Sequence, residues 1–109
     1  MKKLLVVAII SLSSFSTAAL AEIKVGIILG FTGPIESLTP AMRDGARMAF
    51  DEASNSGNLL GGETFTILEA DSTCVDSAAA TAAAEQLVAD GVVAIMGADC
   101  SGVTGAVNA

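Results

Sequence analysis

Three short apolar runs, each rich in β-branched residues, alternate with two helical segments along this sequence. The runs cover residues 23–29, 64–70 and 92–96, and the helical segments lie between them. A strand followed by a helix and a second strand places the two strands parallel in one sheet, joined by a right-handed crossover. The order of the segments therefore predicts an α/β fold with a three-layer arrangement around a parallel sheet.

The first helical segment opens with Thr39 and Pro40, a pair typical of an N-cap and a first helical position. Apolar residues then recur at helical spacing and predict one buried stripe. The acidic residues of this segment share the opposite side with arginines, so we expect a solvated face there and no catalytic carboxylates. The stripe consists of Ala41, Met42, Gly45, Ala46, Ala49, Phe50 and Ala53, and the charged side of Arg43, Asp44, Arg47, Asp51 and Glu52.

The second helical segment is expected to be capped by Asp76 or Ser77 and to continue to about Asp90. Its many alanines favour a helix and allow it to pack closely on a sheet. We expect Leu87 and Val88 to lie on the inner side of this helix.

The three runs differ in how their apolar residues are arranged. The run 92–96 is apolar throughout, which is typical of a strand buried on both faces. The run 64–70 alternates more with polar residues, which places it nearer an edge of the sheet. Three parallel strands alone leave unpaired edges, so we expect residues 22–109 to be the truncated, N-terminal part of a longer ligand-binding domain.

Residues 1–21 have the pattern of a secretory signal peptide. A basic start at Lys2 and Lys3 precedes a short apolar core, and Ala19-Leu20-Ala21 is a small-x-small cleavage site. The apolar core is about half as long as the ~20 residues that a membrane span needs. We therefore expect cleavage after Ala21 and export of the remainder.

The composition argues against several classes of function. The chain has 12 acidic and 5 basic residues, whereas nucleic-acid binding relies on lysine and arginine to neutralise phosphates. It has no histidine, which is the commonest metal ligand and general base. We expect no metal, no cofactor, no catalytic residue and no nucleic-acid partner.

The loop after the run 92–96 is where we expect the chemistry. Gly97 ends the run, and Ser101 and Gly102 open another helix shortly afterwards. A helix start presents free N–H groups and the positive end of the helix dipole, which suit a small anion such as a carboxylate. Val103 stands where a phosphate-binding P-loop has lysine, so a nucleoside triphosphate is not expected. Ser101 is expected to provide a ligand-contacting hydroxyl or an ordinary helix N-cap, and the two roles are compatible because the oxygen lies at a helix start in either case.

Cys74 and Cys100 lie in the loops after the second and third runs. In an exported protein, two cysteines without histidine favour a disulfide over a structural zinc site, which needs four ligands. Ligands of open α/β sheets bind beyond the carboxyl ends of the strands. The two cysteines would therefore hold the rim of a small-molecule cleft, in which Ser101 has no histidine to make it a nucleophile.

The order and spacing of these motifs resemble the leucine/isoleucine/valine-binding family of periplasmic amino-acid-binding proteins. The signal peptide is followed by a strand that ends in Gly-x-x-Gly-Pro, at residues 30–34. The resemblance covers essentially all of residues 22–109, and its most specific element is the pair Cys100-Ser101. The other matching motifs are Asp44-Gly45-Ala46-Arg47-Met48-Ala49, Asp51-Glu52-Ala53, Gly61-Gly62 and Asp71-Ser72-Thr73-Cys74.

The resemblance implies a type I periplasmic-binding fold, with two α/β lobes of which this chain supplies the N-terminal part of lobe one. It implies that the first strand lies between the other two, and that Cys74 and Cys100 form the family's disulfide, which requires both loops to lean inward. Ser101 would receive the α-carboxylate of the ligand, helped by N–H groups around Gly102. Leu38 would lie where the family often has an aromatic side chain over the ligand.

The function implied is that of a periplasmic solute-binding protein and not of an enzyme. It would capture an amino acid or a related small carboxylate or amide and deliver it to the membrane permease of an ABC importer. The acidic partner of the ligand's ammonium group would come from lobe two. The alternatives are an exported α/β hydrolytic enzyme or the sensor domain of a receptor, with the functional residues outside this sequence.

Overall fold

The computed structural model describes residues 22–109, so the expected signal peptide lies outside the described residues. Strands and helices alternate in this part of the chain, and the strands form one parallel sheet in the order β2-β1-β3. The predicted α/β fold is confirmed, and the first strand is the central one. None of the described helices is long and apolar enough to cross a membrane. The elements are β1 Glu22–Leu29, α1 Thr39–Asn55, β2 Thr64–Asp71, α2 Ser77–Ala89, β3 Ala94–Gly97 and α3 Ser101–Val107.

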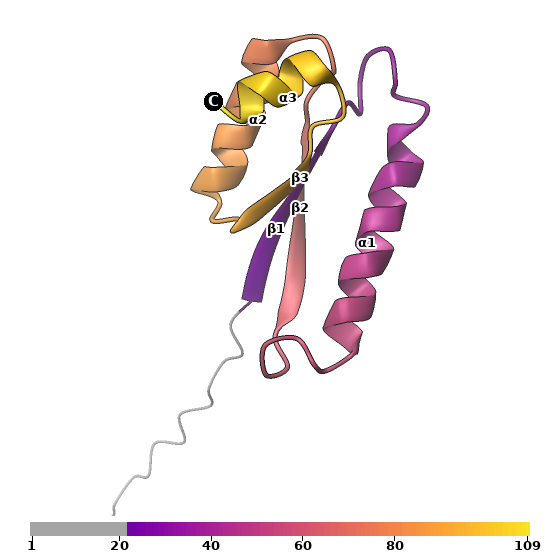
Figure 1. The fold of residues 1–109 in the computed structure, drawn as a ribbon, viewed down its shortest axis with the longest axis vertical. Helices are drawn as coiled ribbons and strands as arrows, with labels where there is room; N and C mark the ends of the chain where they lie inside the picture. Colours follow the sequence, from indigo (N-terminus) through magenta and orange to yellow (C-terminus); the bar gives the residue numbers. More distant parts are fainter. Residues whose placement is uncertain (1–21) are drawn as a thin grey trace, which may run out of the picture.

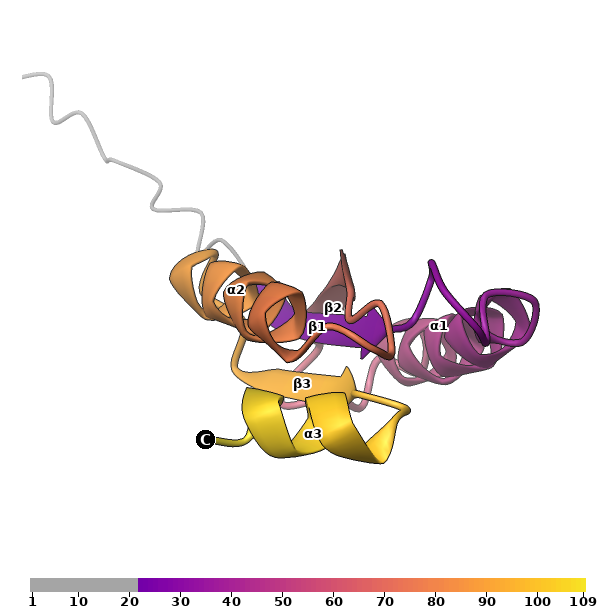
Figure 2. The ribbon, with the colours of Figure 1, turned by 90° about the horizontal axis from the view of Figure 1, so that it is seen from above.

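Helices cover both faces of the sheet. α1 lies on one face and α2 on the other, and α3 packs against α2 beside β3 (Figure 1 and Figure 2). Successive side chains of a strand point to opposite faces, so β1 contributes to both layers. Its residues Ile27 and Ile28 are both fully buried. The central strand is therefore the part of the sheet that both helical layers cover.

The main hydrophobic cluster lies between the sheet and the α2–α3 layer. Ile28 packs there with Ala80, Ala84 and Leu87, which share one side of α2. Asp76 caps the helix as predicted, because its carboxylate accepts hydrogen bonds from the first-turn N–H groups of α2. The short alanine side chains let α2 lie close to the strands.

The predicted inward position of Val88 is wrong, because this side chain is 63% exposed whereas Leu87 is 2% exposed. Neighbouring residues of a helix are separated by about 100° around its axis, so both cannot face the middle of the sheet. Val88 lies instead beside the β3 edge.

The third strand is shorter and more exposed than its sequence predicts. It covers residues 94–97, and Val93, just before it, is 74% exposed. β3 forms an edge of the described sheet, and Met96 is 36% exposed. The prediction of burial on both faces is therefore wrong within residues 22–109, whereas the edge position predicted for β2 is confirmed.

The start and the buried side of α1 also differ from the prediction. Leu38 and not Thr39 is the N-cap residue, and it makes no side-chain capping hydrogen bond. Thr39 is fully buried, and its hydroxyl donates to the Gly30 carbonyl oxygen at 3.1 Å. The predicted buried stripe is only half-buried, and it is narrower than expected because Ala46, Phe50 and Ala53 are partly covered while its other members are exposed. Phe50 packs edge-on against Phe65, with ring centroids 5.0 Å apart.

Candidate functional site

The loops that leave β1, β2 and β3 at their carboxyl ends gather at one end of the sheet (Figure 1). This follows from the parallel pairing of the three strands. The loop from β2 carries Cys74, and the loop from β3 carries Cys100 and leads to Ser101. The candidate residues from separate parts of the sequence thus share one edge of the fold.

Cys74 and Cys100 form a disulfide, with their Cα atoms 5.2 Å apart. They follow the two outer strands, which are separated by two strand spacings or about 10 Å, so both loops lean inward over the end of β1. Thr73 and Cys74 have φ angles of 57° and 68°, a left-handed conformation that turns this loop sharply. Gly30 follows β1 directly, and a Cβ atom there would lie 3.1 Å from the Cys74 Cβ. The bridge therefore crosses the central strand at a residue without a side chain.

Asp99 joins the loop after β3 to the ends of the other two strands. Its Oδ2 accepts a hydrogen bond from the Gly30 N–H at 2.9 Å, and its Oδ1 accepts one from the Ser72 hydroxyl at 3.4 Å. The sequence does not identify Asp99 as a functional residue. No local signal marked its role, because the two partners lie 69 and 27 residues away along the chain.

Asp71, the last residue of β2, binds the loop that follows β1. Its carboxylate accepts hydrogen bonds from the Thr32 hydroxyl at 2.6 Å and from the Thr32 and Thr73 N–H groups at 3.3 and 2.8 Å. Desolvation by partial burial favours a higher pKa, but the hydrogen bonds from Thr32, Thr73 and Phe31 outweigh it and lower the pKa of Asp71 below its ordinary value. The ionised carboxylate is therefore the form that the fold stabilises.

The acidic residues at this edge thus hold loops together. Among residues 22–109, no group of three or more His, Cys, Asp and Glu side chains is arranged to hold a metal ion. The acidic residues of α1 that were expected on a solvated face, Asp44, Asp51 and Glu52, are all exposed.

Ser101 and Gly102 are both exposed at the beginning of α3. The N-cap residue is Cys100, and no side chain makes a capping hydrogen bond there, so the interpretation of Ser101 as an N-cap is wrong. Leu38 is 61% exposed at the start of α1, at the same end of the sheet. The three candidate ligand-binding residues are thus on the surface beyond the carboxyl ends of the strands.

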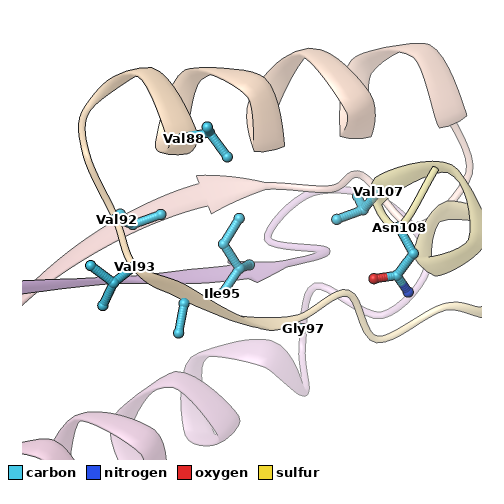
Figure 3. Close-up of a pocket in the computed structure, with 8 residues that line it drawn as sticks. Val88, Val92, Val93, Ile95, Gly97, Val107 and Asn108 are labelled. Carbon is cyan, nitrogen blue, oxygen red and sulfur yellow. The ribbon is translucent and has the colours of Figure 1, made fainter.

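A groove of about 320 Å³ lies elsewhere, between α2, β3 and α3 (Figure 3). Its lining side chains are apolar apart from that of Asn108. A site for a small carboxylate needs several polar groups that orient the ligand, and the lining of this groove offers one polar side chain. We therefore assign the candidate site to the strand-end loops. The groove is lined by Val88, Val92, Val93, Ala94, Ile95, Gly97, Val107 and Asn108.

Residues 22–109 match the family model described as periplasmic binding protein, which covers every residue that the structure describes. The chain belongs to the periplasmic binding protein family. The family resemblance seen in the sequence is confirmed, and the three-stranded parallel sheet is part of an α/β periplasmic binding protein.

Two curated relatives of this periplasmic binding protein have similar names. Leu/Ile/Val-binding protein BraC3 of Rhizobium johnstonii is 30% identical over 101 residues, which are 93% of this chain and 27% of that protein. Leu/Ile/Val-binding protein homolog 3 of Brucella melitensis is 28% identical over 103 residues, which are 94% of this chain and 27% of that protein. The chain therefore spans about a quarter of the length of these relatives.

Removal of the disulfide is expected to destabilise the protein. The cross-link spans a sequence separation of 26 residues, and a loop of this size stabilises the folded state by about 3.5 kcal/mol in the chain-entropy model. The variant carrying both Cys74→Ser and Cys100→Ser should lose roughly this free energy of unfolding in urea denaturation. Wild-type protein reduced with dithiothreitol is the matched control and should show a similar loss. Two thiols that react with an alkylating reagent in the unreduced, denatured protein would contradict the bridge.

Asp71→Asn is expected to lower stability at neutral pH. Since the folded-state pKa of Asp71 is lowered, its contribution is fully present above the unfolded pKa of about 3.9 and is lost as the pH falls through the folded pKa. The denaturation midpoints of wild type and variant should therefore differ at pH 7 and converge at strongly acidic pH. Asp51→Asn, at an exposed position on α1, is the control and should match wild type at neutral pH. A difference for Asp71→Asn that persists unchanged in acid would contradict this role.

Proposed function

We propose that this protein is the solute-binding component of an ABC importer and that it captures an amino acid or a related small carboxylate or amide. The observation that carries the proposal is the family match over residues 22–109. Both curated relatives are named as Leu/Ile/Val-binding proteins, which favours an amino acid as the ligand and binding without catalysis. The partner in this proposal is the membrane permease of the importer.

We also propose that residues 1–21 direct export to the periplasm and are removed after Ala21. Glu22 would then be the first residue of the mature protein. The proposal is supported by the family match, which begins at Glu22. Export also suits a protein whose two cysteines form a disulfide.

In the proposed site, the Ser101 hydroxyl donates a hydrogen bond to the ligand's carboxylate, and the backbone N–H of Gly102 donates a second. The position of both residues supports this, because they are exposed and follow directly after a loop that the disulfide and Asp99 hold. The N–H groups of a first helical turn have no acceptor within the helix and are free to bind a ligand. The exposed Leu38 would contact the apolar part of the ligand.

A thermal-shift panel tests the proposed function with the whole protein. Amino acids, amino-acid amides and small organic acids are added one at a time, and the unfolding temperature is recorded. A ligand present at 100 times its Kd stabilises the folded state by about 2.7 kcal/mol, which gives a measurable rise. We expect a rise with at least one amino acid, and branched-chain amino acids are the first to try. The absence of any shift across the panel would contradict the proposal.

Ser101→Ala is expected to weaken binding of the amino acid found in the panel by about 1–3 kcal/mol, because it removes a hydrogen-bond donor to a charged group. Isothermal titration calorimetry measures the change. Ser77→Ala is the matched control, since Ser77 is also the exposed first residue of a helix after a strand-end loop. It should bind like wild type. Equal affinity of wild type and Ser101→Ala would remove Ser101 from the site.

A further inference from the structure

We infer that Asp99 is the positioning residue of the ligand site, because it fixes the loop between β3 and α3 and thereby places the Ser101 hydroxyl. The inference rests on the proposed function, in which this hydroxyl binds the ligand's carboxylate. Asp99 does not itself touch the ligand in this proposal. It acts through the loop of residues 98–100, which leads directly into Ser101.

The carboxylate of Asp99 contacts the first residue after each of the other two strands. Gly30 follows the end of β1 and Ser72 follows the end of β2. One oxygen accepts the Gly30 N–H at 2.9 Å and the other accepts the Ser72 hydroxyl at 3.4 Å. A single side chain thus connects the carboxyl ends of all three strands.

The two partners of Asp99 are themselves held in place. The Gly30 carbonyl oxygen accepts a hydrogen bond from the buried Thr39 hydroxyl at 3.1 Å, which ties it to the start of α1. Ser72 is fully buried, and its N–H donates to the Leu29 carbonyl oxygen at 2.9 Å. Because both partners are anchored to the central strand, the hydrogen bonds of Asp99 fix the loop relative to the sheet.

The disulfide alone does not determine where Ser101 lies. It attaches the loop at Cys100, and the buried Val103 holds the first turn of α3, but neither contact fixes residues 98 and 99 at the start of the loop. Asp99 adds a second attachment one residue earlier, and two adjacent attachments define a direction as well as a position. The Thr104 hydroxyl closes the loop from the helix side, where it donates to the Ala98 and Cys100 carbonyl oxygens.

Two substitutions separate the hydrogen bonds of Asp99 from its charge. Asparagine keeps one oxygen for the Gly30 N–H, and its NH₂ group can donate to the Ser72 hydroxyl, which is able to accept. Asp99→Asn therefore preserves both contacts without the negative charge. Asp99→Ala removes both contacts and leaves the Gly30 N–H without this acceptor.

The first measurement is amide hydrogen exchange of the whole protein without ligand. In Asp99→Ala we expect exchange about tenfold faster at Gly30 and over residues 99–104, because a hydrogen bond to a charged group is lost at the loop's anchor. Exchange over α2 should stay unchanged, and Asp99→Asn should remain within about threefold of wild type. Unchanged exchange at Gly30 in Asp99→Ala would overturn the inference, whatever the ligand proves to be.

The second measurement is the Kd of L-leucine at a temperature where every variant is folded. We expect Asp99→Ala to raise the Kd about tenfold and Asp99→Asn to keep it within about threefold. In a Ser101→Ala background, Asp99→Ala should raise the Kd by a smaller factor than in wild type, since part of its effect acts through the Ser101 hydroxyl. Equal weakening by Asp99→Asn and Asp99→Ala, or fully additive effects with Ser101→Ala, would overturn the positioning role.

The two proposals fail in different ways. If wild-type protein does not bind L-leucine or any compound of the panel, the proposed function fails, while the exchange measurement still decides whether Asp99 holds the loop. If Asp99→Ala does not fold, two other single variants replace it in both measurements. Asp99→Asn is one, and Ser72→Ala, which removes one of the two hydrogen-bond donors to Asp99, is the other. Ser72→Ala with exchange over residues 99–104 and L-leucine binding both like wild type would then overturn the inference.

Discussion

The disulfide between Cys74 and Cys100 is the constraint on which the candidate site depends, because it joins loops from two strands that are not neighbours. A bridge between these loops has to pass over the end of the central strand. The chain allows this with Gly30, which has no side chain beneath Cys74, and with the left-handed turn at Thr73 and Cys74. The loop conformations therefore follow from the covalent link and the order of the strands taken together.

Carboxylates at this edge of the sheet do not conflict with a site for an anionic ligand, because their oxygens already accept hydrogen bonds. Asp99 receives the Gly30 N–H and the Ser72 hydroxyl, and Asp71 receives groups from Thr32 and Thr73. The positive ends of the N–H and O–H dipoles face the oxygens of each carboxylate. Each carboxylate thereby connects loops that are far apart in sequence. The acidic residues here therefore contribute to loop geometry, and in the proposed function the ligand's carboxylate would bind the exposed groups of Ser101 and Gly102.

The sequence predicted the fold well because the fold depends on local patterns. Apolar runs and helical spacing identify β1, β2, α1 and α2, and the side-chain cap of α2 at Asp76 is a contact over two or three residues. Val88 was misplaced within a correctly predicted helix, whereas other failures come from contacts that lie outside the local pattern. Thr39 has the residue type of a cap, but its hydroxyl instead binds Gly30, and Val93 has the residue type of a buried strand although the described sheet ends beside it. The role of Asp99 likewise depends on the carboxyl ends of three strands lying close together, and no local sequence pattern encodes this.

The exposure of the candidate residues also indicates how much of the ligand surface other parts of the binding site have to cover. Small-molecule sites bury most of the ligand surface, commonly 70–90% or more. Ser101, Gly102 and Leu38 lie on an open surface, and the groove between α2, β3 and α3 does not include them. A carboxylate held by one hydroxyl and one N–H in contact with water gains little, because water offers equivalent hydrogen bonds. Tight binding in the proposed function therefore requires a second surface that closes over these loops and excludes water, and the loops held by Asp99 and the disulfide would be the rigid half of that site.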